Sequence, residues 1–257
     1  MAGAVVKTYG IGPIPLAALP FDDAVDEVVR RARAGQPTAV HFANAYTIAL
    51  ADSDPEYAAL FAAPTAVNLT DGMPVAWVGR RAYRRSSAEW PRVYGPDVMQ
   101  AVLARGDLRH FLLGGDEATL EALQDKITRR FPRALIVGAE SPPFRPLNAQ
   151  ERHEQDRRIR ESGAKIVWVG LGTPKQDWEV ARLVEELPVV AMAVGAAFDF
   201  IAGTKPQAPM WMQRSGIEWL YRLAIEPRRL SKRYLWGNPR FLRAAARNPG
   251  LRRPWPT

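Results

Sequence analysis

The sequence contains no cysteine, and this absence excludes disulfides, thiolate metal sites and cysteine nucleophiles. Histidine is almost as scarce. His41, His110 and His153 lie far apart in the chain and show no spacing typical of metal ligands, so we expect each to be solvated or hydrogen-bonded within the structure. The chain therefore offers few of the side chains on which metal and thiol chemistry depend.

One acidic pair does match a metal-binding pattern. Asp52 and Asp54 form the Asp-x-Asp pattern that holds a metal in many nucleotide-sugar enzymes, but Pro55 follows at once. Asp directly before Pro is typical of a helix start, with Asp as the N-cap and Pro in the first helical position. We therefore interpret Asp54 as a helix cap, and we expect neither a metal ion nor an organic cofactor.

Membrane-crossing and export signals are absent as well. No apolar run reaches the length of a transmembrane helix, and the first 25 residues lack a basic start followed by a long apolar stretch. We expect the chain to be made and kept in the cytoplasm.

The sequence also lacks the common phosphate-binding fingerprints, because neither GxxxxGK[ST] nor GxGxxG occurs. Residues 169–178, VGLGTPKQDW, contain Gly-x-Gly, but Pro174 and Lys175 follow it. This departure weakens the case for a P-loop nucleotidase and for an ordinary dinucleotide-binding domain.

Positive charge is concentrated in the C-terminal region. From Trp211 onward the sequence has eleven Lys and Arg against two Glu, a net charge of +9, whereas the whole chain carries +8. The residues before Trp211 are therefore close to neutral. A basic tail rich in Trp and Tyr indicates contact with an anionic partner such as phosphates, nucleic acid or an acidic membrane surface.

Helix and strand patterns alternate along the chain. Residues 21–35 form an amphipathic pattern that ends at Gly35, which is typical of a helix with its stop signal. Nearly continuous apolar runs, typical of buried parallel strands, alternate with further helical patterns. We expect strands at 38–44, 65–70, 110–115, 133–139, 165–172 and 188–195, two helices within 45–63, and helices at 117–131, 149–162 and 174–187. This order predicts an α/β fold with a parallel sheet covered by helices.

The same helix and strand patterns also predict the domain organisation. No internal repeat or long flexible linker is present. We expect residues 1–205 to form one domain, and residues 206–257 to form a basic, aromatic appendage.

Small and polar residues stand where the predicted strands end. These are Asn44, Asp71 with Gly72, Gly114 with Gly115, Gly170 with Gly172, and Gly195. Glycine at a strand-to-helix turn lets a ligand approach the backbone, and the N–H groups of the next helix can bind a phosphate. Five such turns on one edge of a sheet predict a pocket, with a nucleotide as its occupant.

Asp71 has two interpretations from the residues alone. Asp followed by Gly is common in turns, and Asp is a favoured helix N-cap. Alternatively, a carboxylate at the carboxyl end of a strand can be a catalytic or ligand-binding group. The strand pattern does not decide between them.

Six segments together resemble the WecG/TagA/CpsF glycosyltransferases, glycosyltransferase family 26. They are NLTDGMPVAW (68–77), RVYGPDVM (92–99), FLLGG (111–115), VWVGLGTPKQDW (167–178), VGAAFDFIAGTKPQAPMWM (194–212) and GIEWLYRLAIEPRRLSKRY (216–234). Their order and spacing cover most of the chain. The resemblance implies a Rossmann-like enzyme that transfers a sugar from a UDP-sugar to a polyprenyl-diphosphate-linked saccharide, with inversion and without a required metal. It also implies cell-surface polysaccharide synthesis at the inner face of the cell membrane, and it leaves a homo-oligomer open.

The resemblance implies roles for individual residues. Asp71 becomes the candidate general base for the acceptor hydroxyl. Asn44 is expected beside the sugar, Gln176 at the donor or acceptor, and Arg92 near the acceptor or diphosphate. The remaining expected substrate contacts are Asp199 at the nucleotide base, Arg222, Arg229 and Arg233 at the leaving diphosphate, and Gly72, Gly114, Gly115, Gly172 and Lys175.

Three departures from the family pattern are present. Phe42 stands where the family usually has Thr, which puts part of the sugar contact in doubt. Asp177 replaces a usual Glu, and Ala196 with Ala197 replaces a usual Gly-Gly. The identity of the donor sugar does not follow from this sequence.

Two rival functions remain at this stage. The basic tail is also compatible with a nucleic-acid-binding protein, although its charges alternate with apolar residues in a way that suits a membrane-surface helix at least as well. These residues are Trp219, Leu220, Tyr221, Leu223, Leu230, Leu235 and Trp236. A nucleotide-sugar hydrolase or epimerase would use the same pocket without an acceptor. Neither rival explains the six segments together, so we expect no nucleic-acid partner.

Overall fold

The computed structural model describes residues 7–84, 89–247 and 252–254, and its contacts divide the chain into two units. Unit 1 comprises Met1–Ala24, Phe42–Tyr94 and Gln207–Thr257, and unit 2 comprises Val25–His41 and Gly95–Pro206. Both units are therefore assembled from segments that are distant in sequence. The expected domain boundary near residue 205 concerns independent folding, and it stays a prediction.

Unit 2 contains a parallel sheet flanked by helices. Its strands follow the order β6-β5-β7-β8-β3, and Ile166 of the middle strand pairs with His110 on one side and Val190 on the other. The strands are β3 (Thr38–Ala43), β5 (Arg109–Gly114), β6 (Leu135–Glu140), β7 (Ile166–Gly170) and β8 (Val190–Ala193). The helices are α1 (Phe21–Ala34), α5 (Gly95–Arg105), α6 (Glu117–Arg130), α7 (Ala149–Ser162), α8 (Lys175–Glu186) and α9 (Ala197–Ala202). The first four residues of α1 and the last two of β3, Phe42 and Ala43, belong to unit 1.

Apolar side chains on the inner strands of unit 2 hold the helices against the sheet. Val167 and Val169 of β7 are fully buried and form one core cluster with Val180 and Leu183 of α8. The ends of β5 and β7 approach closely, because a Cβ atom at Gly114 would lie 2.7 Å from the backbone of Gly170. Gly114 also has a φ of +117°, so only glycine suits this strand end.

Unit 1 contains the remaining strands, in the order β4-β2-β1-β9. The strands are β1 (Lys7–Ile11), β2 (Ile14–Ala17), β4 (Ala66–Thr70) and β9 (Arg252–Pro254). The helices are α2 (Ala45–Ser53), α3 (Pro55–Ala62), α4 (Met73–Ala82), α10 (Met210–Arg214), α11 (Glu218–Ile225) and α12 (Pro227–Arg247). β2 pairs with β4 in parallel, while β1 is antiparallel to both β2 and β9. Two of these three pairings are antiparallel, whereas the pairings among β6, β5, β7, β8 and β3 are all parallel, so the strand pairings as a whole are mostly parallel, as predicted.

Local sequence patterns did not predict the β1–β2 hairpin, the strand β9 or the helices α4, α5, α9 and α10. The hairpin strands are short, and Gly10, Gly12, Pro13 and Pro15 interrupt their apolar pattern. The predicted elements otherwise agree with the structure to within a few residues. The Asp54 cap is confirmed, because its carboxylate accepts hydrogen bonds from the backbone N–H groups of Glu56 and Tyr57 at 3.0 and 3.1 Å.

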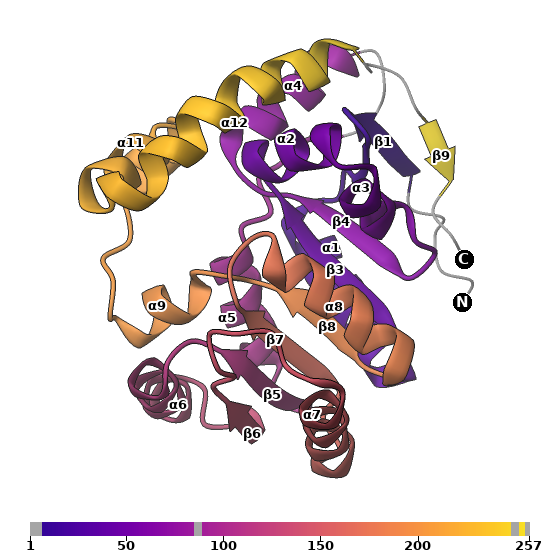
Figure 1. Ribbon diagram of the computed structural model, residues 1–257, viewed down its shortest axis with the longest axis vertical. Coiled ribbons are helices and arrows are strands. Elements are labelled where there is room, and N and C mark those ends of the chain that lie inside the picture. Colours follow the sequence, from indigo (N-terminus) through magenta and orange to yellow (C-terminus); the bar gives the residue numbers. More distant parts are fainter. Residues whose placement is uncertain (1–6, 85–88, 248–251, 255–257) are drawn as a thin grey trace. The chain divides into compact units, whose positions relative to one another are not determined.

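The C-terminal segment forms part of the core of unit 1. Helix α12 packs against α2 (Figure 1), and Phe241 and Ala244 of α12 belong to the same buried cluster as Tyr9 and Ile48. One residue that the sequence pattern assigned to a membrane-facing surface does not lie on one, because Leu230 is buried. Trp236 is partly buried and packs against this core. Both positions arise because α12 has one face toward the protein.

A packed aromatic cluster fixes the segment that follows α4. The ring of Trp90 stacks on Tyr83 with centroids 5.6 Å apart, and it lies so close to Gly79 that a Cβ atom there would be 2.1 Å from it. Further along, the N–H of Val93 donates to the carbonyl of Thr70 at 2.7 Å. Residues 90–94 are thereby held beside the carboxyl end of β4.

Helix α12 spans 21 residues but is rich in arginine. Among the helices in the described ranges, none combines the length and the apolar character needed to cross a membrane.

Candidate active site

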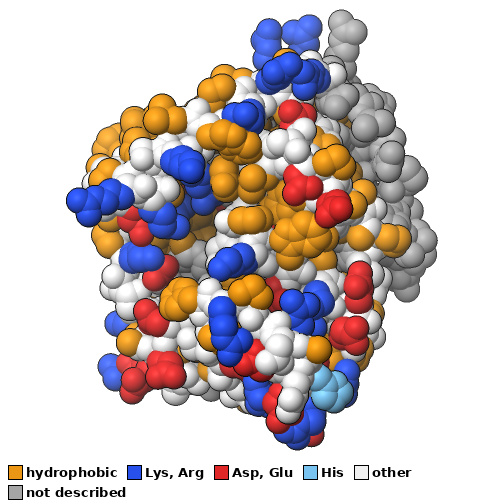
Figure 2. All heavy atoms as spheres, viewed as in Figure 1, with side chains coloured by type: hydrophobic (Ala, Val, Ile, Leu, Met, Phe, Trp, Pro, Cys, Tyr) orange, Lys and Arg blue, Asp and Glu red, His pale blue; other side chains and the backbone are white. Residues whose placement is uncertain are grey.

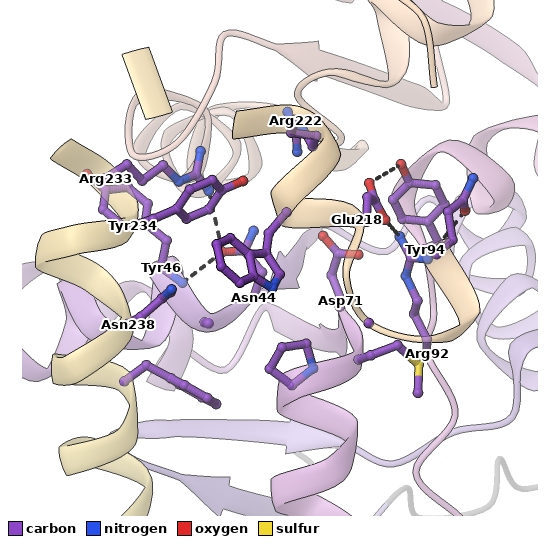
Figure 3. Close-up of a pocket in the computed structure, with 18 of the residues that line it drawn as sticks. Asn44, Tyr46, Asp71, Arg92, Tyr94, Glu218, Arg222, Arg233, Tyr234 and Asn238 are labelled. Carbon is purple, nitrogen blue, oxygen red and sulfur yellow. Dashed lines mark hydrogen bonds and ion pairs between the residues drawn. The ribbon is translucent and has the colours of Figure 1, made fainter. Parts of the chain in front are cut away.

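Unit 1 contains a cavity of about 300 Å³ at the carboxyl end of β4. Its walls come from the starts of α2 and α4, from Arg92 and Tyr94, and from side chains of α10, α11 and α12. Figure 3 shows Asp71, Arg92 and Glu218 close together on one side, with Arg233, Tyr234 and Asn44 on another. The cavity therefore brings side chains from three distant parts of the sequence to one place.

Asp71 follows β4 directly, and its side chain points into this cavity (Figure 3). The backbone N–H of Asp71 donates to the carbonyl of Ala43 at 2.9 Å, which ties this turn to the end of β3. The N-cap of α4 is Gly72, with a φ of +86°, and no side chain in the described ranges caps this helix. The carboxylate of Asp71 is therefore not used as the helix cap that the sequence allowed. Its Oδ1 atom is buried and has no hydrogen-bond partner among the described residues.

The surroundings of Asp71 make its carboxyl group an unusually strong base. Its pKa is about 6, because burial and, to a smaller extent, the negative charge of Glu218 raise it more than the attraction of Arg92 lowers it. Arg222 and a hydrogen bond from Asn44 act in the lowering direction. The group is therefore ionised near neutral pH, and it binds a proton more readily than an exposed aspartate does.

Arg92 lies beside Asp71 in a set of charged and polar contacts. Its Nη2 atom donates to Oε2 of Glu218 at 2.5 Å, and its guanidinium lies 3.7 Å from the centre of the Tyr94 ring. The Tyr94 hydroxyl donates to Oε1 of Glu218 at 3.0 Å. Burial works against the charge of Arg92, but the carboxylates of Asp71 and Glu218 outweigh it and raise the pKa of Arg92. For the Tyr94 phenol, burial has the opposite effect and raises the pKa, so this group stays protonated.

The other side of the cavity is cationic. Arg233 is largely buried, its guanidinium carbon lies 4.2 Å from the centre of the Tyr46 ring, and its Nη2 atom is 3.5 Å from Oδ1 of Asn44. Burial lowers the pKa of Arg233, and its Nε atom has no hydrogen-bond partner in the described part of the chain. Asn44 itself caps α2 by accepting from the N–H groups of Tyr46 and Thr47. A partly unsatisfied guanidinium in a cavity is suited to bind an anion.

The structure places the predicted residues of unit 1 as follows. Asn44, Asp71, Gly72, Arg92, Arg222 and Arg233 all line the cavity. Arg229 does not line it, because its exposed side chain bonds to Glu226. Sequence reasoning missed Tyr46, Tyr94, Glu218, Tyr234 and Asn238. Tyr94, Glu218 and Tyr234 stand inside the segments that carry the family resemblance, but no spacing pattern marks any of the five.

The other predicted residues belong to unit 2. Gly114, Gly115 and Gly172 each have a positive φ at the end of a strand, and Lys175 is exposed at the start of α8. The Nε2 atom of Gln176 donates to the carbonyl of Ala193 at 2.9 Å, whereas its buried Oε1 atom has no partner among the described residues. Asp199 of α9 pairs with Lys205 at 3.0 Å. The expected donor contacts of these six residues stay predictions.

The departures from the family pattern have structural correlates. Phe42 is buried in β3 and brings no hydroxyl group to the turn before Asn44. Asp177 is buried on α8, and its Oδ1 atom lies 3.0 Å from Nδ1 of His41. Ala196 and Ala197 form the start of α9.

The histidines occupy structural or solvated positions, as expected. His41 is buried beside Asp177, and His110 accepts a hydrogen bond from the indole N–H of Trp168 at 3.2 Å. Burial lowers the pKa of His110 to about 4, so this ring is neutral near pH 7. His153 is exposed on α7. The described residues contain no group of three His, Asp or Glu side chains arranged to hold a metal.

Comparison with known families supplies the chemical context of this cavity. A family model described as the glycosyl transferase WecG/TagA/CpsF family matches residues 9–254, which is nearly the whole chain. The match includes both sides of the cavity, from the turn after β3 to α12. Members of this family are glycosyltransferases of cell-surface polysaccharide synthesis, and the chain belongs to the WecG/TagA/CpsF family.

Proposed function

We propose that this protein transfers a sugar from a UDP-sugar to a polyprenyl-diphosphate-linked saccharide, with inversion at the anomeric carbon. The observation that carries the proposal is the carboxylate of Asp71. Its Oδ1 atom is buried at the cavity with no hydrogen-bond partner among the described residues, and its pKa is about 6. A base with these properties can accept a proton from a hydroxyl group at neutral pH.

The reaction is a single displacement. A hydroxyl group of the acceptor saccharide attacks the anomeric carbon of the donor, and its proton moves to Asp71. The new bond joins the acceptor oxygen to the anomeric carbon, while the bond from that carbon to the diphosphate oxygen breaks. UDP leaves with the electron pair of the broken bond, and attack from the opposite face inverts the configuration. Asp71 afterwards releases its proton to water.

The leaving diphosphate needs positive charge, and the cavity offers it in arginine side chains. Arg222 and Arg233 both line the cavity, and Arg233 has donor capacity left on its Nε atom. Guanidinium groups in a partly buried site stabilise a developing phosphate charge strongly.

Because these arginines can stabilise the leaving diphosphate, we propose that transfer requires no divalent metal. Loss of transfer in excess EDTA, followed by recovery with magnesium or manganese, would contradict this part of the proposal.

The acceptor is anchored in a lipid bilayer, so the enzyme must work at the membrane surface. Figure 2 shows hydrophobic side chains together with Lys and Arg over the region of α11 and α12. Leu220 and Leu235 are 44% and 79% exposed, and Arg228 and Lys232 are exposed on the same helices. Apolar and basic side chains on one surface suit an anionic membrane. We propose that α11 and α12 attach the enzyme peripherally to the inner face of the cell membrane.

The first prediction concerns Asp71. Asp71→Asn should lower acceptor-dependent UDP release by about 100-fold to 10,000-fold, because the base is lost. The assay combines a panel of UDP-sugars with a short-chain polyprenyl-diphosphate acceptor. Asp52→Asn is the matched control, since Asp52 lies on α2 outside the cavity and should transfer normally. Equal turnover by the parent and Asp71→Asn would exclude Asp71 as the base. UDP release that does not depend on the presence of the acceptor would instead indicate a hydrolase.

A second prediction separates the buried arginine from the surface charge. Arg233→Gln should lower kcat/KM for the donor by roughly 10-fold to 100-fold, because a charge-assisted contact to the diphosphate is lost. Arg228→Gln removes the same charge from an exposed position on α12 and should change kcat/KM by less than about twofold. Similar losses in both variants would show that only the overall charge of the helix matters.

The membrane attachment can be measured by vesicle co-sedimentation. The double variant Leu220→Ser with Leu235→Ser should bind anionic vesicles at least roughly tenfold more weakly, because each leucine contributes about 1 kcal/mol or more on burial. The matched control is Leu135→Ser with Phe144→Ser, which removes two exposed apolar side chains from unit 2. Weaker binding by this control, with normal binding by the α11–α12 variant, would place the membrane contact elsewhere.

A further inference from the structure

Glu218 is the first residue of α11, and both oxygens of its carboxylate are engaged. Oε2 accepts from Nη2 of Arg92 at 2.5 Å, and Oε1 accepts from the hydroxyl of Tyr94 at 3.0 Å. The side chains of Glu218 and Arg92 are only 15% and 13% exposed. This contact is therefore a largely buried ion pair rather than a surface salt bridge.

The position of the Arg92 guanidinium depends on this pair. Residues 89–94 have no helix or strand hydrogen bonds of their own, so the backbone alone does not fix the long arginine side chain. The ring of Tyr94 supports one face of the guanidinium, and Oε1 of Gln213 lies 3.4 Å from Nη1. The contact to Glu218 is the shortest of these and the one with opposite charge.

Helix α11 depends on polar contacts in turn. None of its residues is buried, and Leu220 and Ile225 are exposed. Its apolar contacts come from side chains that are not fully buried, such as the edge-to-face pair of Trp219 with Tyr234 of α12, whose ring centroids lie 5.7 Å apart. The helix carries Trp219 and Arg222 at the cavity. A buried ion pair costs desolvation energy and often adds little net stability, but it can fix one arrangement of the elements that it joins.

The two carboxylates of the cavity differ in what they can do. Both oxygens of Glu218 accept hydrogen bonds, whereas Oδ1 of Asp71 has no partner among the described residues. Asp71 can therefore take up a proton from a substrate, and Glu218 is suited to act through Arg92.

We propose that Glu218 is a positioning residue of the transferase site: its carboxylate holds the Arg92 guanidinium beside Asp71 and attaches α11 to the cavity. The kinetic part of this inference rests on the proposed function, with Asp71 as the base. The negative charge of Glu218 also favours the protonated form of Asp71, whereas the nearby charge of Arg92 opposes that form more strongly, so a variant that displaces Arg92 and keeps the negative charge should raise the pKa of Asp71.

Charged and titratable groups line the cavity around Asp71 from several elements. They are Tyr46 from α2, Arg92 and Tyr94 from the segment after α4, Glu218 and Arg222 from α11, and Arg233 with Tyr234 from α12. Of the carboxylates that face Asp71 from these described walls, Glu218 alone can raise its pKa in this way.

The first test follows Asp71 directly and needs no activity. The protein is labelled with ¹³C at aspartate carboxyl groups, and the Asp71 signal is identified by its loss in Asp71→Asn. The signal should titrate near pH 6 in the parent and at least about 0.5 pH unit higher in Glu218→Asp, because this variant keeps the negative charge but displaces the Arg92 charge that lowers the pKa of Asp71. Glu218→Gln also displaces Arg92 but removes the negative charge, so its Asp71 signal should titrate below that of Glu218→Asp. An Asp71 titration that is the same in the parent and Glu218→Asp would overturn the inference that Glu218 holds Arg92 beside Asp71.

The second test measures transfer against pH in the same variants. Glu218→Gln and Glu218→Asp should both lower kcat at pH 8 by roughly tenfold or more, because each displaces Arg92, and Glu218→Asp should also move the acid limb of kcat/KM to higher pH. Glu226→Gln is the matched control, since it breaks a surface pair at the other end of α11 and should change kcat by less than about twofold. Full turnover by folded Glu218→Asp would overturn the positioning role. No acceptor-dependent transfer by the parent would refute the proposed function, while the Asp71 titration would still decide the effect of Glu218.

Discussion

The burial of one carboxylate beside an arginine organises the candidate site. Folding buries Oδ1 of Asp71 without giving it a hydrogen-bond partner among the described residues, and a buried polar atom of this kind costs free energy. The nearby charge of Arg92 offsets part of that cost. Arg92 is in turn held by Glu218 and Tyr94, and the segment that carries it is held by the packing of Trp90. The end of β4, the aromatic cluster around Trp90 and the start of α11 therefore together fix the surroundings of Asp71.

The C-terminal segment, from α10 to α12, has three roles: it contributes to the core, to the cavity and to the surface. Its composition, rich in basic and aromatic residues, indicated only contact with an anionic partner. Phe241 and Ala244 complete the core of unit 1, Arg222 and Arg233 line the cavity, and Leu235 faces solvent. Each role occupies a different face of α11 or α12, which an amphipathic helix makes possible. Removal of the whole segment would therefore disturb packing, cavity and surface at once. Single substitutions on one face separate these contributions more cleanly.

Much of the fold could be predicted from the sequence, because apolar runs and helix signals are local. The strands from β3 to β8 and the cap at Asp54 were identified from such patterns. The β1–β2 hairpin could not be, since glycine and proline interrupt its short strands. Asn44 and Asp71 were identified at the ends of predicted strands and Arg92 through the family resemblance, and the structure brings them to one cavity. Glu218 and Tyr94 were missed because their importance lies in contacts more than 120 residues apart along the chain.

The central claim is that Asp71 is held as a buried base at the expense of stability, and the free energy of unfolding tests it most directly. Folding raises the pKa of Asp71 from 3.8 to about 6, so the folded chain binds this proton more tightly than the unfolded chain does. The stability that this confers is fully present below about pH 4 and is lost as the pH rises through 6. The free energy of unfolding of Asp71→Asn, relative to the parent, should therefore increase by about 1 to 3 kcal/mol between pH 4 and pH 8. A difference that stays constant over this range, or that falls, would contradict the account.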